Sequence, residues 1–403
     1  MATIIAPTAH FTEGFNQSAT TYDGANEALD ISPILDTLDP TDVPLLTLIG
    51  RDGLTATQVK HEWLEDDVRG LSATTTDTDL NNTSTGDVTL TLATAGDYLK
   101  FRGAAVGTGP SDIVRISSTA GWEIAPVIAT ANNTIQVTRG YFGDTPVDHT
   151  GYTKTIEIIG VFQPQGKTTV GTQRTTIKRT LYNYTQIFED SYTANETQQN
   201  TDKILAQNER AYQFGRIATD MGRIFERTLL YGRKKAVSVG TNGGTMDGIV
   251  ARLSTNVYNK SGAILQEAHL YDAVKAIWEV GGGSELYGIY GPAQQKRVGQ
   301  LLDPYRQAGY SDRVLGTWVN RFQTPLGVNV TFVLDRHIQT DAILLMDKSR
   351  VKFGPLRGRA LGMSPIPRTS RESQTWQWTG EYTSETKQES AHAFIYGLAT
   401  TGY

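Results

Sequence analysis

Cysteine is absent from this sequence of 403 residues, which excludes disulfide bonds and thiolate metal sites and suits a reducing cytoplasm. Long hydrophobic runs are absent too. The stretch Ala342–Met346 is far short of the roughly 20 apolar residues that a membrane-spanning helix needs. The first residues lack the basic start and apolar run of a signal peptide. We therefore expect a soluble protein with no membrane partner.

The usual signatures of catalysis and metal binding are also missing. The sequence has no H-E-x-x-H motif, because Glu65 stands where the second histidine should be, and no G-x-S-x-G motif. Residues 240–244 are rich in glycine but lack the lysine of a phosphate-binding loop. Residues 77–81 begin like a calcium loop, yet the turn glycine and the final glutamate are not in place. We therefore predict no enzyme activity, no cofactor and no metal site.

The overall composition favours a protein that buries surface against copies of itself. Hydrophobic residues make up 38% of the chain, which is low for one globule of this length, and 40 residues are glycine. The net charge of -5 does not mark the whole chain as a nucleic-acid binder. An open, thin subunit with little core of its own fits these numbers.

The first 50 residues form an unusual opening segment. Four prolines interrupt it, which excludes a long helix. It contains no lysine or arginine but seven acidic residues, which are Glu13, Asp23, Glu27, Asp30, Asp36, Asp39 and Asp42. We predict an extended arm over 1–50.

The next part of the chain has the alternating pattern of β-strands. Residues 55–67 read as one strand, residues 88–161 as five or six short strands between Gly, Asn and Asp turns, and residues 168–189 as a long polar strand. The short strands are numerous enough for a small barrel or sandwich. We predict that this β domain has its own core, drawn from Val88, Leu90, Leu92, Ile113, Val114, Ile116, Ile135, Val137 and Ile156.

The second half alternates helices and strands. Apolar residues at a three-to-four spacing predict a long amphipathic helix over 200–231. Further helices are predicted near 265–280 and, with proline in the first turn, over 292–302. Strands are predicted over 286–290, 328–334 and 342–346, and β structure returns over 375–397. The fold class is therefore α+β.

This order of parts resembles the tailed-phage major capsid proteins with the Hong Kong 97-like fold. Several short phrases also resemble one branch of that family. They are DVPLL (42–46), HEWLED (61–66), NYTQIF (183–188), YGP (290–292) before a helix, and ESAHA (389–393). The family has an N-terminal arm, an extended E-loop, a long spine helix, an axial domain and a peripheral domain. The departure is the stretch 88–161, which is too rich in strands for a simple hairpin.

The resemblance implies a division of the chain. Its parts are an N-terminal arm (1–50), a first E-loop strand and linker (51–87), an inserted β-barrel or β-sandwich domain (88–161), a returning E-loop strand (162–190), the spine helix and peripheral domain (191–260), an axial domain (261–345) and closing peripheral-domain strands (346–403).

The resemblance also implies a function. It implies a structural subunit that assembles as hexamers and pentamers into an icosahedral phage head, in the virion, after assembly in the host cytoplasm. The implied partners are copies of itself, a portal, scaffolding or decoration proteins, and packaged double-stranded DNA held by weak nonspecific contacts. The alternatives are another virion part, such as a tail or decoration protein, and a carbohydrate-active or proteolytic enzyme.

Charge suggests where neighbouring subunits meet. Residues 348–371 contain no acid, and their seven bases are Lys348, Arg350, Lys352, Arg357, Arg359, Arg368 and Arg371. Two solvated surfaces of opposite sign, or a basic run facing DNA, would explain this pattern. We favour a contact in which the acidic arm of one subunit crosses these residues in another. The other contact candidates are Leu35, Asp36, Asp39, Asp42, Leu45, Leu46 and Trp63.

Overall fold

The computed structural model describes most of the chain from Asp42 onward. The described residues are 42–51, 53–66, 70–78, 80–81, 86–105, 108–163, 165, 178–200, 209–238, 243–302, 321–368 and 372–402. They form two compact units, one of residues up to Val59 and from Tyr184, the other of Lys60–Asn183. Among the described residues, no helix is long and apolar enough to cross a membrane.

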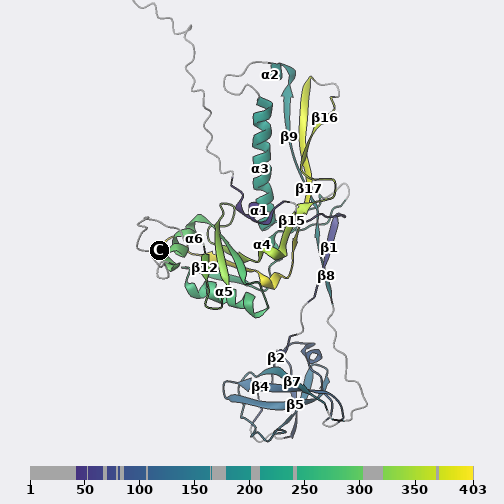
Figure 1. Cartoon of the computed structure of the whole chain (residues 1–403), viewed down its shortest axis with the longest axis vertical. Coiled ribbons are helices and arrows are strands. Elements are labelled where there is room, and N and C mark those ends of the chain that lie inside the picture. The colour runs from purple at the N-terminus through teal and green to yellow at the C-terminus, as the bar shows by residue number, and fades with distance from the viewer. Residues whose placement is uncertain are drawn as a thin grey trace, which may run out of the picture. The chain divides into compact units, whose positions relative to one another are not determined.

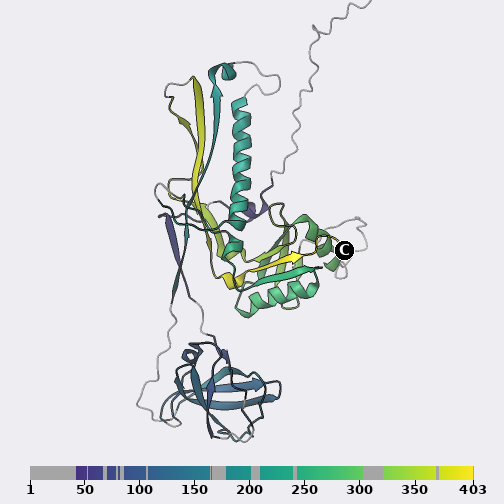
Figure 2. The same cartoon turned by 180° about the vertical axis from the view of Figure 1, so that it is seen from behind.

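A mixed six-stranded sheet forms the centre of the first unit (Figures 1 and 2). Its strands, in spatial order, are β10 (Val257–Ala263), β18 (Ala393–Leu398), β14 (Ile343–Met346), β11 (Glu285–Tyr290), β13 (Asn329–Leu334) and β12 (Arg321–Gln323). Strand β14 is apolar throughout because both of its faces are buried. Ile343 and Leu345 face the core that α5 (Glu267–Glu279) covers. Leu344 and Met346 face the core that contains the buried side of α3 (Glu209–Tyr231).

The helix α3 (Glu209–Tyr231) is the longest helix of the described chain. Its buried residues Ile217, Met221, Phe225 and Leu229 recur every four positions, which places them on one face. At 1.5 Å per residue it is about 35 Å long. The predicted helix over 200–231 is therefore confirmed for 209–231. Residues 196–200 form a separate short helix, α2 (Glu196–Asn200), and residues 201–208 lie outside the description.

A long sheet lies beside α3. Strand β17 (Ser373–Thr386) pairs antiparallel with β9 (Gln186–Asn195) and with β15 (Val351–Pro355) and β16 (Gly362–Ile366). Both views show α3 alongside β9 (Figures 1 and 2). Phe188 of β9 and Tyr382 of β17 contact Phe225 of α3 through their rings.

The opening segment ends in a short helix, α1 (Pro44–Ile49). Residues 1–50 were expected to be extended, so this part of the expectation is corrected. Proline at the first helical position explains the start, because that position needs no backbone N–H and the ring favours a helical φ. Gly50, with φ at 85°, ends the helix. The remaining residues of the expected arm, 1–41, are outside the described part.

The second unit contains a two-stranded ribbon and a β-barrel. The ribbon pairs β1 (Lys60–Glu65) with β8 (Arg179–Tyr184). The barrel strands, in spatial order, are β2 (Ser72–Thr74), β7 (Thr155–Phe162), β4 (Ser111–Ser118), β5 (Gly121–Ala131), β6 (Thr134–Arg139) and β3 (Gly86–Thr91). A bridge between Thr75 and Leu92 closes the circle. The turn between β5 and β6 consists of Asn132 and Asn133, both at positive φ, as tight hairpins require.

The barrel core contains seven of the nine apolar residues expected there. They are Leu90, Leu92, Val114, Ile116, Ile135, Val137 and Ile156, and all are buried. Val88 packs against this core while partly exposed, and Ile113 is half-buried outside it. The barrel also takes in β2 and the start of β3, which precede the stretch 88–161.

Candidate functional site

The proposed contact residues near the N-terminus divide into buried and exposed ones. Leu45 and Leu46 are 0% and 2% exposed and belong to the core around α3. We expected them to contact a neighbouring subunit, but α1 packs them into their own chain instead. Asp42 is exposed and forms an ion pair with Arg336 at 3.2 Å, which is worth at most about 1 kcal/mol.

Three other predicted contact residues of this segment lie outside the described part. They are Leu35, Asp36 and Asp39. Trp63 in β1 is described and is only 7% exposed, and its Nε1–H donates to Glu65 Oε1 at 2.8 Å. Little of its ring is therefore available to a neighbour in the structure as it stands.

The basic residues of 348–371 are partly neutralised by acids of the same chain. Arg350 pairs with Asp347 at 3.1 Å, and Arg359 pairs with Glu381 of β17 at 2.9 Å. Arg368 pairs with Glu196. Arg371 lies outside the described residues. Lys348 sits in a short turn, and Lys352 and Arg357 are exposed in and just after β15. Within the described chain, Asp42 makes no ion pair with this segment.

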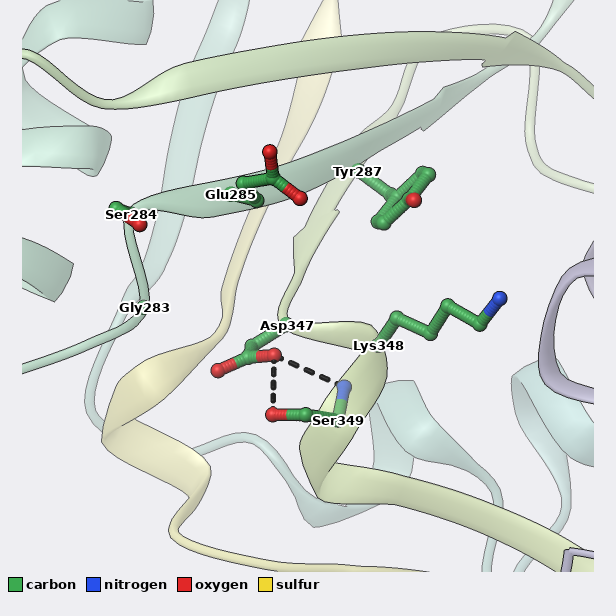
Figure 3. A pocket seen from close by; sticks show the side chains of 7 residues that line it. All are labelled: Gly283, Ser284, Glu285, Tyr287, Asp347, Lys348 and Ser349. Carbon is green, nitrogen blue, oxygen red and sulfur yellow. Dashed lines mark hydrogen bonds between the residues drawn. The ribbon is translucent and has the colours of Figure 1, made fainter.

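A shallow hollow of about 530 Å³ lies between β11 and the turn after β14 (Figure 3). Its lining residues are Gly283, Ser284, Glu285, Tyr287, Asp347, Lys348 and Ser349. Burial alone would raise the pKa of Asp347, but hydrogen bonds from Ser349 and Arg350 lower it below its usual range. Both oxygens of this carboxylate are therefore occupied, Oδ1 by Ser349 and Oδ2 by Arg350. No cluster in the described residues is suited to a metal ion.

The barrel contains a buried polar cluster that the sequence analysis missed. Arg139 Nε donates to Glu123 Oε1 at 2.7 Å, and its Nη2 donates to Glu123 Oε2 at 3.1 Å. The same guanidinium also donates to the backbone oxygens of Asn81 and Val147. Arg139 therefore fastens two loops to the barrel wall. Its position as the last residue of β6, on the buried face, was the only sequence signal.

A serine, a histidine and a glutamate in this cluster have the composition of a hydrolase triad but not its geometry. Ser118 Oγ lies 2.7 Å from His149 Nδ1, while His149 Nε2 lies 3.7 Å from Glu123 Oε1, too far for a hydrogen bond. Glu123 is already bound by Arg139. His149 is 0% exposed, and burial lowers its pKa. A substrate would not reach this imidazole, so we assign the cluster a structural role.

Comparisons with known proteins point to one family. The model of the SU10 major capsid protein family matches residues 11–399. No curated protein sequence matches the chain.

The chain is also similar to several solved structures, two of which are capsids of GTA particles. The chain resembles the capsid of a native GTA particle, with a TM-score of 0.52 and 10% identity over 95% of this chain and 99% of that one. For the capsid of an empty GTA particle the TM-score is 0.50 and the sequence identity is 9%, over 95% of this chain and 100% of that one. For the SrpI encapsulin complex of Synechococcus elongatus PCC 7942 the TM-score is 0.42 and the sequence identity is 11%, over 57% of this chain and 79% of that one.

These findings confirm the expected fold class, α+β with the Hong Kong 97-like capsid fold. The family is structural, which agrees with the expectation of a protein without enzyme activity, and it implies a place in the virion. The match covers nearly the whole chain, and the fold agrees with it: the chain belongs to the SU10 major capsid protein family.

Proposed function

We propose that this protein forms the shell of a phage head as hexamers and pentamers on a closed icosahedral lattice that encloses double-stranded DNA. The family match over residues 11–399 carries this proposal. Copies of the chain would be the main partner, with a portal, and scaffolding or decoration proteins, completing the particle in the host cytoplasm. The contact with DNA would be weak and nonspecific.

Exposed strand edges support assembly with neighbouring copies. All five residues of β16 are exposed, and β17 is its one strand partner among the described residues. Met363 and Ile366 are 44% and 41% exposed on this strand. An exposed strand edge with apolar side chains is a surface on which another chain can pack. A second copy would cover it, as part of more than about 2,000 Å² buried per contact.

Electron microscopy and sedimentation of the purified chain test the proposal. Closed shells with pentamers at the vertices and hexamers between them are expected. A folded monomer that persists at micromolar concentration and physiological salt would contradict it.

We propose, further, that the acidic arm of one subunit contacts the basic strands of another, and the exposure of the basic residues decides which of them to change in a test. Arg359 already pairs with Glu381, so changing it would disturb the subunit itself. Lys352 and Arg357 are the better partners to reverse, because both are exposed. Asp42 already pairs with Arg336, so the arm variant changes only Asp36 and Asp39 to Lys, which should slow assembly and weaken its salt dependence.

A charge swap then tests the pairing directly. Adding Lys352→Glu and Arg357→Glu to the arm variant should partly restore the assembly rate, measured by light scattering. The control adds Lys275→Glu, on the exposed side of α5, and should restore nothing. Equal rates for the two combined variants would contradict the arm contact without touching the proposal that the protein forms a shell.

A further inference from the structure

Two buried carboxyl groups interact in the first unit, close to where α1 packs against α3. Glu226 of α3 and Asp335, just after β13, are both 0% exposed. Glu226 Oε1 accepts the N–H of Leu45, and Oε2 accepts the N–H of Leu46, each at 2.8 Å. Asp335 Oδ1 accepts the N–H of His337 at 2.7 Å. Asp335 Oδ2, however, is buried without a donor among the protein's fixed N–H groups.

A single shared proton resolves this arrangement. A buried acceptor without a donor is costly, and so are two ionised carboxylates in one dry site. A proton on Glu226 lets this group donate to Asp335, which satisfies the remaining oxygen. Burial first, and then the charge of Asp335, raise the pKa of Glu226 to about 7, against the opposing N–H bonds from Leu46 and Leu45. Burial also raises the pKa of Asp335.

The charged groups around the pair are committed to other partners. Arg227 of α3 donates through Nε to His337 Nδ1 at 3.4 Å, and Arg336 pairs with Asp42. His337 Nε2 lies 3.3 Å from the backbone oxygen of Asp42. The turn 335–337 therefore carries one carboxyl of the pair and both contacts to Asp42.

Tyr231 and Asp341 complete the surroundings on the far side of the turn. The Tyr231 hydroxyl accepts the N–H of Gln339 at 2.8 Å, and burial, with Asp335 and Asp341 nearby, raises its pKa. Tyr231 therefore does not change charge in the pH range where the carboxyl pair titrates.

We propose that the Glu226–Asp335 pair is a proton-operated latch that holds Asp42, the point where residues 1–41 join the described chain, against the turn 335–337. When the shared proton leaves, two buried negative charges repel each other. Glu226 keeps the N–H groups of Leu45 and Leu46, so the turn is the part that moves. Its movement breaks both contacts to Asp42 and changes how the opening segment is anchored.

The direction of the pH effect follows from linkage. The closed latch raises the pKa of Glu226 from 4.5 to about 7. The stabilisation of the closed latch is therefore complete at a pH below 4.5, the ordinary pKa of Glu226. It is lost as the pH rises through about 7, the pKa of Glu226 in the closed latch. The equilibrium constant for opening should rise roughly tenfold per pH unit between about pH 5 and about pH 7, and then level off.

Hydrogen exchange of the full-length chain across this pH range tests the latch. In the wild type, the exchange rates are first corrected for the intrinsic rates. The protection factors of residues 42–49 and 335–339 should then fall about tenfold per pH unit between about pH 5 and about pH 7. Asp335→Asn replaces the shared proton with an amide N–H that donates to Glu226, while its oxygen still accepts from His337. Protection in this variant should lack the change with pH that the carboxyl pair produces. The control Asp341→Asn removes a nearby charge outside the pair and should behave like the wild type.

Two results would overturn the latch. One is wild-type protection of 335–339 that does not change with pH, which decides the matter without any variant. The other is an Asp335→Asn protein with the pH dependence of the wild type. Protection of the buried strands β11 and β14 shows whether the variant is folded.

Discussion

Removing the ring of Phe225 tests the packing on which the first unit depends. Phe225 is 0% exposed, and its ring centroid lies 4.6 Å from Phe188, 4.8 Å from Tyr382 and 5.8 Å from Phe353. These three residues come from β9, β17 and β15. One side chain of α3 therefore joins the helix to three strands that are distant in sequence.

The expected loss of stability is large. Replacing a buried phenylalanine with alanine costs about 3–5 kcal/mol, and aromatic pairs add about 0.5–1.5 kcal/mol each beyond their buried area. We expect Phe225→Ala to lower the free energy of unfolding by about 4–6 kcal/mol, which is a large part of the total of a typical domain. Ile224→Ala is the matched control, because Ile224 is the preceding residue of α3 and is 44% exposed. It should cost about 0.5 kcal/mol.

Urea unfolding followed by far-ultraviolet circular dichroism measures both variants, and electron microscopy counts the shells that each one forms. The Phe225→Ala variant should form far fewer shells than the wild type. The Ile224→Ala variant should keep its fold. If the two variants unfold within about 1 kcal/mol of each other, the assignment of the buried face of α3 is incorrect.

Three further predictions concern the barrel, a tight backbone contact and a buried histidine. Arg139→Met should lower the free energy of unfolding in urea by about 3–5 kcal/mol, because it leaves Glu123 buried without its ion-pair partner. The control Arg115→Met breaks an exposed pair with Glu157 and should lower it by less than about 1 kcal/mol. Gly354→Ala should cost about 1–3 kcal/mol or more, since its Cβ would lie 1.8 Å from a backbone oxygen; a thermal midpoint like that of the wild type would contradict this. Burial lowers the pKa of His392 from 6.5 to about 4. As the pH drops, the unfolded chain therefore binds a proton at His392 before the folded chain does. The free energy of unfolding should fall as the pH drops from about 6.5 to about 4. His392→Gln, compared with the wild type across that range, should lose this part of the pH dependence.

Much of the local structure could be predicted because local signals were sufficient. The helix α6 (Pro292–Leu302) was predicted with its observed ends, since proline marks the first turn and the apolar spacing marks the length. Strands β11 and β14 were recognisable as short apolar runs that a sheet buries on both faces. The barrel strands were recognisable as short apolar runs between Gly, Asn and Asp turns, and the structure places one such turn at Asn132 and Asn133.

Contacts between distant residues could not be predicted in the same way. Leu45 and Leu46 looked like anchors for another subunit, and nothing near them in sequence shows that Glu226, about 180 residues later, accepts their N–H groups. The arginine at 350 looked available to a partner, but the structure pairs it with Asp347, which lies just outside the basic segment.

The sequence by itself determined the order of elements, the two faces of α3 and the family, because periodicity, turn residues and short phrases are properties of neighbouring positions. Only the tertiary structure decided which charges are neutralised, how the barrel closes between Thr75 and Leu92, and that Glu226 and Asp335 share one dry site. The physical reason is that burial and hydrogen bonding depend on segments brought together by folding. A carboxyl group has an ordinary pKa in an open chain and a raised one only where other segments exclude water from it.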